Sequence, residues 1–301
     1  MHSGYCILSK SGNSALLAKE LNKSMEENNS LNLDYVWNFL FYSFDSASLK
    51  ASYYNSRNGW KAGSLTGDIY LEKSREKQSH YLKLAKQGIL LRQSTLYEFI
   101  DSKKPWRVID LGGGSGWVYA YLVKHLRYNN IFYINLEMQE TEEYFKEILG
   151  DLPNLFWSLD NAEKNQSDEV ILYSNSSLQY FKDNNYLVAT IQRVDPDIII
   201  LDDLHVGPSN SVFSLQNYWD YMIVNRFLDI EKLRNYIARI GYQEILYRDY
   251  ESNISMDIKA KLWDGATELS DIPLHKTLVF KRVPIKGSDY QYDFGIHKEE
   301  K

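Results

Sequence analysis

The feature that most constrains this chain is a strand-like segment that runs directly into a cluster of glycines. Residues 108–116 read VIDLGGGSG, so an apolar run ends in Asp110 and the glycines lead into helical spacing from Trp117. Glycines let the backbone adopt positive φ and approach a ligand closely, and the helix that follows offers free N–H groups at its start. The segment therefore predicts a strand–turn–helix unit with a ligand at the turn, in space that a side chain at Gly112 or Gly114 would fill.

After Pro105 the chain alternates short apolar runs with segments of helical spacing. The predicted strands are 106–111, 131–136, 154–157, 169–173, 197–201, 243–247 and 277–281, and the predicted helices are 117–126, 141–149, 184–193 and 218–240. Such alternation predicts an α/β fold, in which a parallel sheet carries helices on both faces. Ligands of such sheets bind at the carboxyl ends of the strands. The last two strands lack a full crossover helix, so we expect them to form an antiparallel edge.

The glycine spacing separates two cofactors that use a turn of this kind. A nicotinamide dinucleotide turn has the pattern G-x-G-x-x-G/A, which would put Trp117 where strand and helix must pack closely. The spacing here is G-x-G-x-G after Asp110, and it resembles motif I of the class I S-adenosylmethionine-dependent methyltransferases. The resemblance implies a Rossmann-like sheet of seven mostly parallel strands, with S-adenosylmethionine held by Asp110, Gly112, Gly114 and Gly116. A dinucleotide site and a purely structural turn are the alternatives.

Two acidic residues further along the chain are candidates for contacts to a nucleoside. Glu137 ends the next predicted strand, 21 residues after Gly116. One carboxylate there can accept hydrogen bonds from both ribose hydroxyls, but NAD enzymes also carry an acid at this place. In the methyltransferase family that the glycine turn resembles, an acidic or polar residue near the adenine often follows the third strand. In this chain Asp160 follows the third predicted strand. A solvated Glu137 and an ordinary loop aspartate at 160 are the alternatives.

The segment 169–181, EVILYSNSSLQYF, gives a narrower resemblance. Together with the glycine turn it resembles a bacterial family of methyltransferases that is often associated with gene sets for cell-surface polysaccharides. The resemblance spans roughly residues 60–283 and implies O-methylation of a sugar or a sugar-linked small molecule. The chain departs from that family after the fifth predicted strand, where Asp202 is followed by Asp203 instead of a basic or hydroxyl residue.

The ends of the fourth and fifth predicted strands carry the polar residues that could handle a methyl acceptor. We expect Ser174 and Asn175 to line the cofactor. His205 is the candidate base, because imidazole titrates near neutral pH, and Asp202 is the candidate residue to orient it. In one alternative, Asp202, Asp203 and His205 hold a hard ion such as Mg²⁺. In another, the two aspartates only cap the loop and His205 is exposed. With His205 as the base, we predict no metal.

Composition limits where the chain works and what it binds. The net charge is −6, and no run of Lys and Arg is longer than two, so a nucleic-acid partner is not expected. The single cysteine, Cys6, allows neither an intrachain disulfide nor a zinc site built on cysteines. No signal peptide or membrane-spanning run is recognisable in the sequence. These features predict a cytoplasmic protein.

We expect three regions. These are an N-terminal, mainly helical cap (1–76) with a possible helix at 14–27, a methyltransferase domain (77–283) that opens with helical spacing over 77–100, and a polar tail (284–301). The predicted function is S-adenosylmethionine-dependent methylation of a small-molecule acceptor, a sugar or nucleotide-sugar, in surface polysaccharide biosynthesis. A methyltransferase-fold module without catalysis, which binds a partner, and an NAD(P)-dependent oxidoreductase are the alternatives.

Overall fold

The computed structural model describes residues 37–41, 43–57, 68–87, 94–124, 126–128, 130–137, 139–149, 154–159, 169–207, 211–218, 221–250 and 275–283. The helix expected at 14–27, Asp160 and the tail at 284–301 lie outside these ranges. No helix within them is long and apolar enough to cross a membrane.

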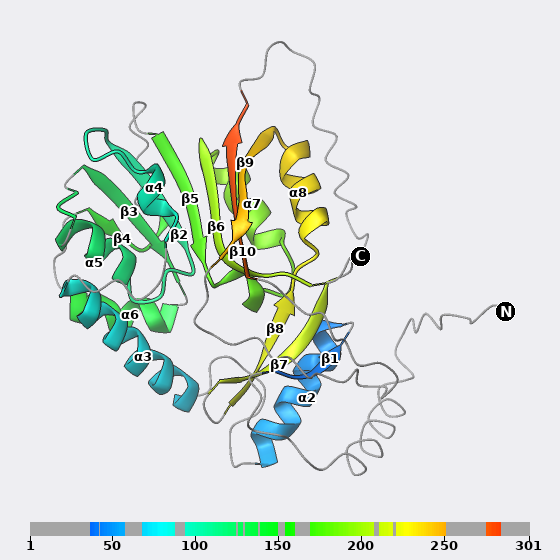
Figure 1. The fold of residues 1–301 in the computed structure, drawn as a ribbon. Helices are drawn as coiled ribbons and strands as arrows, with labels where there is room; N and C mark the ends of the chain where they lie inside the picture. The colour runs from blue at the N-terminus through cyan, green and yellow to red at the C-terminus, as the bar shows by residue number, and fades with distance from the viewer. Residues whose placement is uncertain are drawn as a thin grey trace, which may run out of the picture.

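The main sheet has seven strands in the order β4-β3-β2-β5-β6-β10-β9 (Figure 1). The first five strands of that order run parallel, and β10 pairs antiparallel with both β6 and β9. This confirms the predicted α/β fold with an antiparallel edge. The strands are β2 (Trp106–Leu111), β3 (Ile131–Leu136), β4 (Leu155–Phe156), β5 (Glu169–Asn175), β6 (Ile198–His205), β9 (Tyr242–Asp249) and β10 (His275–Arg282).

Side chains of the central strands alternate between two apolar clusters, one on each face of the sheet. In β6, Ile198 and Ile200 belong to one cluster, and Ile199 and Leu201 belong to the other. Each such buried side chain contributes roughly 1.5–3 kcal/mol to folding. The first face is covered by α3 (Asp68–Lys86), α4 (Leu96–Phe99), α5 (Trp117–Lys124) and α6 (Gln139–Leu149), and the second by α7 (Asn185–Val194) and α8 (Ile230–Arg239).

Local signals set several helix ends. Helix α7 ends at Val194, and the residue that caps it, Asp195, is left-handed (φ 48°) and precedes Pro196, where the sequence predicts the stop. Helix α8 begins after Asp229, whose side chain accepts a hydrogen bond from the N–H of Lys232 at 3.0 Å. The helical spacing over 77–100 does not form one helix, because it is divided between α3 and α4.

A second, smaller sheet has the antiparallel order β1-β7-β8. Its strands are β1 (Trp37–Phe41), β7 (Val212–Tyr218) and β8 (Tyr221–Phe227), and α2 (Phe44–Arg57) packs against them. The rings of Phe44 and Phe213 meet edge to face, with centroids 5.8 Å apart. The N-terminal region therefore contains the helix α2, and it also completes a sheet with a segment about 170 residues further along the chain. The boundary expected at residue 76 falls within α3.

The prediction of one long helix over 218–240 is wrong, because its first third forms β8. That strand is buried on both faces: Met222 and Val224 pack toward α2, and the Asn225 side chain points to the main sheet. A strand covered on both sides lacks the polar and apolar alternation that would identify it. Its apolar and aromatic residues therefore resembled a helix face in the sequence.

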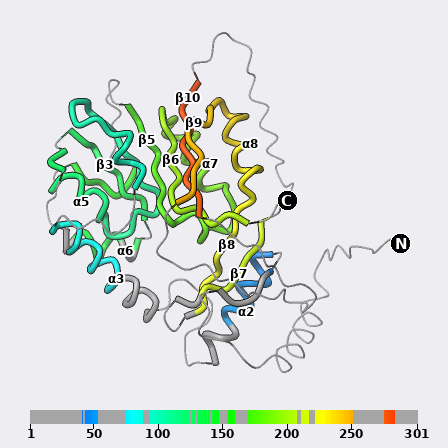
Figure 2. The backbone as a smooth tube through the Cα atoms, viewed as in Figure 1, coloured from blue at the N-terminus to red at the C-terminus, as the bar shows by residue number. Residues whose placement is uncertain are grey.

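The two sheets join where β6 ends. The backbone of Leu228 donates to the carbonyl of His205 at 2.7 Å, and the backbone of Gly207 donates to the carbonyl of Leu228 at 2.9 Å. Val206 and Leu228 form a parallel bridge at the same place. The small sheet consequently lies against the carboxyl end of β6, and Figure 2 shows β7 and β8 beyond that end of the main sheet.

Candidate functional site

The glycine turn lies at the carboxyl end of β2. On one side of β2 the sheet continues with β3 and β4, and on the other side it continues with β5, β6, β10 and β9. Ligands of open α/β sheets bind at such a topological switch point. Gly112, Gly114 and Gly116 have φ values of 74°, 57° and 70°, a region that side chains disfavour. The N–H of Gly112 donates to the carbonyl of Leu136 at 2.8 Å, which fixes the turn to the end of β3. The predicted strand–turn–helix unit is confirmed.

Neighbouring protein atoms also require these glycines. A Cβ atom at Gly112 would lie 2.5 Å from the Cβ of Ser177, and one at Gly114 would lie 2.6 Å from Oε1 of Gln78 on α3. Gln78 Oε1 also accepts hydrogen bonds from the N–H and the hydroxyl of Ser115, both at 3.3 Å. The space beside these two glycines is thus occupied by protein. This corrects the expectation that a side chain there would displace only a ligand.

Asp110 lies beneath the turn and is fully buried. The Tyr133 hydroxyl donates to its Oδ2 at 2.5 Å. Burial raises the pKa of the Asp110 carboxyl to about 7, and the charge of Glu137 adds to the rise while the Tyr133 hydrogen bond opposes it. The structure therefore places Asp110 under the turn and joins it to β3 through Tyr133.

The end of β3 presents two polar residues to the same region. Glu137, the predicted ribose ligand, is half-buried there and is near enough to Asp110 to affect its pKa. Asn135, which the sequence analysis missed, donates from Nδ2 to the carbonyl of Gly114 at 2.9 Å. Its Oδ1 is buried and has no hydrogen-bond partner in the part of the chain that the structure describes. A buried acceptor of this kind is rare in a native fold, and it fits a donor group on a bound ligand.

Ser174 and Asn175 end β5, beside the glycine turn. The hydroxyls of Ser174 and Ser177 lie 2.6 Å apart, and Ser177 donates to the carbonyl of Leu111 at 2.6 Å. Asn175 donates from Nδ2 to the Tyr173 hydroxyl at 2.9 Å. The Ser177 bond to Leu111 holds the segment that leads to the short 3₁₀ helix η2 (Leu178–Tyr180) against the glycine turn. Ser174 supports this contact through its bond to Ser177.

Asp202 is fully buried on the face of the sheet covered by α4. Its oxygens accept hydrogen bonds from the N–H and hydroxyl of Thr95, at 2.8 and 2.6 Å, and from the Thr277 hydroxyl at 2.8 Å. Burial raises its pKa to about 6 in spite of these hydrogen bonds. Asp202 thus joins α4 to β6 and β10. The side chain that the structure places against Nδ1 of His205 is that of Asn225, where the sequence analysis expected Asp202.

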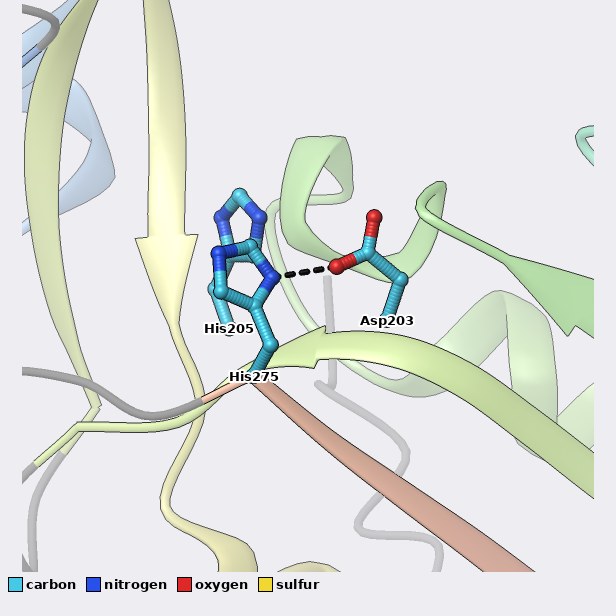
Figure 3. Close-up of side chains that lie close together, drawn as sticks. All are labelled: Asp203, His205 and His275. Carbon is cyan, nitrogen blue, oxygen red and sulfur yellow. Dashed lines mark hydrogen bonds and ion pairs between the residues drawn. The ribbon is translucent and has the colours of Figure 1, made fainter. Parts of the chain in front are cut away.

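A buried cluster of Asp203, His205 and His275 stands at the junction of the two sheets (Figure 3). His205 and His275 are register partners across β6 and β10, and their rings meet edge to face with centroids 4.6 Å apart. Nδ1 of His275 donates to Oδ1 of Asp203. Nδ1 of His205 lies 2.9 Å from Oδ1 of Asn225 on β8. The three side chains of the cluster are at most 5% exposed, so the alternative of a solvent-exposed His205 does not hold.

A β-bulge aims Asp203 at this cluster. The register between β6 and β10 shifts where Leu204 pairs with Lys276 and Leu201 pairs with Leu278. Asp203 is left-handed at this point (φ 53°), a conformation that most residues with a side chain avoid and that aspartate adopts more readily. Bulges of this type re-aim side chains near functional sites. The sequence could not have placed His275 or Asn225 here, since they are 70 and 20 residues from His205.

No family model matches the sequence, and no curated protein matches it. The fold is similar to solved structures at low identity. A protein of Listeria monocytogenes, provisionally assigned as an S-adenosylmethionine-dependent methyltransferase, is 11% identical over 69% of this chain and 99% of its own, with a TM-score of 0.43. An S-adenosylmethionine-dependent methyltransferase of Mesorhizobium loti is 14% identical over 62% of this chain and 96% of its own, with a TM-score of 0.40.

A third structure is the 1,6-didemethyltoxoflavin-N1-methyltransferase of Burkholderia thailandensis with bound 1,6-didemethyltoxoflavin and S-adenosylhomocysteine. It is 7% identical over 79% of this chain and 88% of its own, with a TM-score of 0.39. All three TM-scores are below 0.5. The fold assignment therefore rests on the order and direction of this chain's own strands.

Proposed function

We propose that this chain is an S-adenosylmethionine-dependent methyltransferase. The observation that carries the proposal is the position of the G-x-G-x-G turn at the carboxyl end of β2, at the switch point of a sheet with the order β4-β3-β2-β5-β6-β10-β9. The spacing of the glycines does not match a dinucleotide-binding turn, because Trp117 is buried at the position where such a turn needs a small residue. The strand order and the glycine spacing thus support the same cofactor.

The residues around the turn fit the parts of this cofactor. We assign the backbone of residues 112–116 to its amino-acid portion, the Glu137 carboxylate to the ribose hydroxyls, and the unpartnered Asn135 Oδ1 to a donor group on the ligand. Asp160 and Asn175 remain proposed contacts from the sequence. When bound, S-adenosylmethionine supplies a methyl group on a positively charged sulfur, which a nucleophile can displace directly. The chain then needs only to position an acceptor and remove its proton.

We propose a small molecule with a hydroxyl group, a sugar or nucleotide-sugar, as the acceptor. The resemblance of residues 169–181 to a family associated with polysaccharide gene sets supports the sugar. A hydroxyl must lose a proton as it is methylated, and the cluster of Asp203, His205 and His275 offers two routes for that loss. His205 can accept the proton directly, or a metal ion held by the cluster can lower the pKa of the hydroxyl.

Calorimetric titration of the purified chain tests the cofactor. We expect S-adenosylmethionine and S-adenosylhomocysteine to bind and NAD⁺ not to bind. Glu137→Gln should weaken binding of both sulfur nucleosides about 10- to 100-fold, since hydrogen bonds to a charged group contribute ~1.5–3 kcal/mol. Glu169→Gln is the matched control, because Glu169 is an exposed acid at the opposite, amino end of β5.

The other outcomes each contradict the proposal in a different way. Binding of NAD⁺ alone would favour an oxidoreductase. No binding of any nucleoside would favour a module of methyltransferase fold that binds a partner. Equal loss of affinity in Glu137→Gln and Glu169→Gln would remove the ribose assignment. Once binding is established, transfer of a radiolabelled methyl group to a panel of nucleotide-sugars and to matched amines tests the acceptor class, and labelling of the amines alone would overturn the hydroxyl.

A further inference from the structure

We propose that Asp203, His205 and His275 form a binding site for a divalent transition-metal ion. Each residue offers one ligand atom, and these atoms lie within 4.8 Å of one another. Donors around one ion at ~2.0–2.2 Å stand roughly 3–4 Å apart, so small side-chain movements bring the three donors to one ion. Figure 3 shows Nδ1 of His275 hydrogen-bonded to the carboxylate of Asp203, with the ring of His205 beside them. An ion bound by this nitrogen and this oxygen would replace the proton between them, and the proton would be released to solvent.

The supporting residues of His205 match those of a metal ligand. A histidine bound to a metal through one ring nitrogen commonly donates its other N–H to a carbonyl or carboxylate, which fixes the ring and the tautomer. Asn225 Oδ1 occupies that position, 2.9 Å from Nδ1 of His205. Since a carbonyl oxygen only accepts hydrogen bonds, Nδ1 carries the proton and Nε2 keeps the lone pair that a metal would use.

The fold holds the other two donors in place. His275 faces His205 across the β6–β10 pair, so backbone hydrogen bonds of the sheet set the spacing of the two rings. Asp203 reaches the cluster only through its left-handed conformation at the bulge. A proton relay would need one histidine and one acid. The cluster also holds a second imidazole, that of His205, which Asn225 fixes and which adds a third donor for a metal ion.

The donor set also selects the kind of ion. Mg²⁺ prefers oxygen donors and retains water, and the Mg²⁺ site considered from the sequence needed Asp202. The Asp202 carboxylate instead accepts hydrogen bonds from Thr95 and Thr277. The third member of the cluster is the imidazole of His275. Two imidazoles with one carboxylate favour Zn²⁺, Fe²⁺, Co²⁺ or Ni²⁺. Three protein ligands leave further positions on the ion for oxygen atoms of a substrate.

Metal binding is measured apart from methyl transfer, so this proposal and the proposed function can fail separately. The full chain is stripped with a chelator and titrated with Co²⁺, whose visible absorption reports its ligands, and with Zn²⁺ by calorimetry. We expect one ion per chain, with millimolar Mg²⁺ unable to compete. His275→Gln, His205→Gln and Asp203→Asn should each weaken binding by more than the ~100-fold that loss of a supporting residue can cause. Asn225→Ala should weaken it ~10- to 100-fold.

His80→Gln is the matched control, because it removes an exposed imidazole from α3 and should leave the affinity unchanged. Thermal unfolding of the stripped chains checks that each variant folds. Should a ligand variant fail to fold, Asn225→Ala and the Co²⁺ spectrum of the unmodified chain still decide. Absence of a Co²⁺ spectrum in the unmodified chain, unchanged affinity in Asn225→Ala and the folded ligand variants, or displacement of Co²⁺ by Mg²⁺ would each overturn the site.

Discussion

Replacement of Asp110 by asparagine should change how the stability of this protein depends on pH. The Asp110 carboxyl is fully buried, and burial raises its pKa from 3.8 to about 7. In the unfolded chain the same group is hydrated and titrates near its ordinary value. Between about pH 4 and about pH 7 the folded protein therefore holds a proton that the unfolded chain has released.

The sign and size of the effect follow from this difference. A group whose pKa is raised on folding stabilises the fold relatively more at low pH, and the advantage is lost as the pH rises through the folded pKa. A difference of about three units at ~1.4 kcal/mol each lowers the free energy of unfolding by about 4 kcal/mol across the window. Roughly 3 kcal/mol of this falls between pH 5 and pH 8.

Urea unfolding followed by tryptophan fluorescence, at pH 5 and at pH 8, measures the effect. Asp110→Asn keeps an oxygen for the Tyr133 hydroxyl, and any cost of its buried amide is the same at both pH values. The variant should therefore gain about 3 kcal/mol relative to the unmodified chain on going from pH 5 to pH 8. Glu169→Gln, at an exposed acid, should show no such gain. Parallel pH profiles for the unmodified chain and Asp110→Asn would refute the raised pKa and the reasoning from burial.

Three further predictions concern other features of the fold. Tyr133→Phe removes the hydrogen bond that opposes the pKa rise of Asp110, so it should destabilise the protein more at pH 8 than at pH 5 in the same urea experiment; an equal loss would contradict this. Gly112→Ala should cost ~1–3 kcal/mol more than Gly241→Ala in the free energy of unfolding, because both glycines have positive φ but a Cβ meets nothing within 4 Å at Gly241. Phe227→Ala, which removes a fully buried ring, should cost ~3–5 kcal/mol, and a loss below 1 kcal/mol by denaturant unfolding would show that the junction of the sheets tolerates a cavity.

Sequence patterns predicted the alternating strands and helices of the main sheet well because these elements follow from local signals. The uninterrupted apolar residues of β6 indicated a strand, and the glycines after β2 indicated a turn. Asp195-Pro196 marked the end of α7, where the left-handed residue stands. Each of these features depends on a few consecutive residues, so no knowledge of the fold was needed.

The small sheet could not be predicted in the same way. Its strand β1 pairs with β7 across about 170 residues, and β8 is covered on both faces. The apolar positions of β8 fitted a helix equally well until its neighbours were known. The N-terminal cap and the segment between β6 and α8 therefore looked like separate regions in the sequence.

The sequence by itself determined the G-x-G-x-G turn, the acid beneath it and the α/β order of the main sheet, because their signals are local. Tertiary structure alone decided which polar residues meet at the ends of the strands. It directed Asp202 to Thr95 and Thr277, and it brought His275 and Asn225 to His205. The physical reason is that strand pairing and a single bulge set these neighbours, and pairing between distant strands leaves no mark in the spacing of residues along the chain.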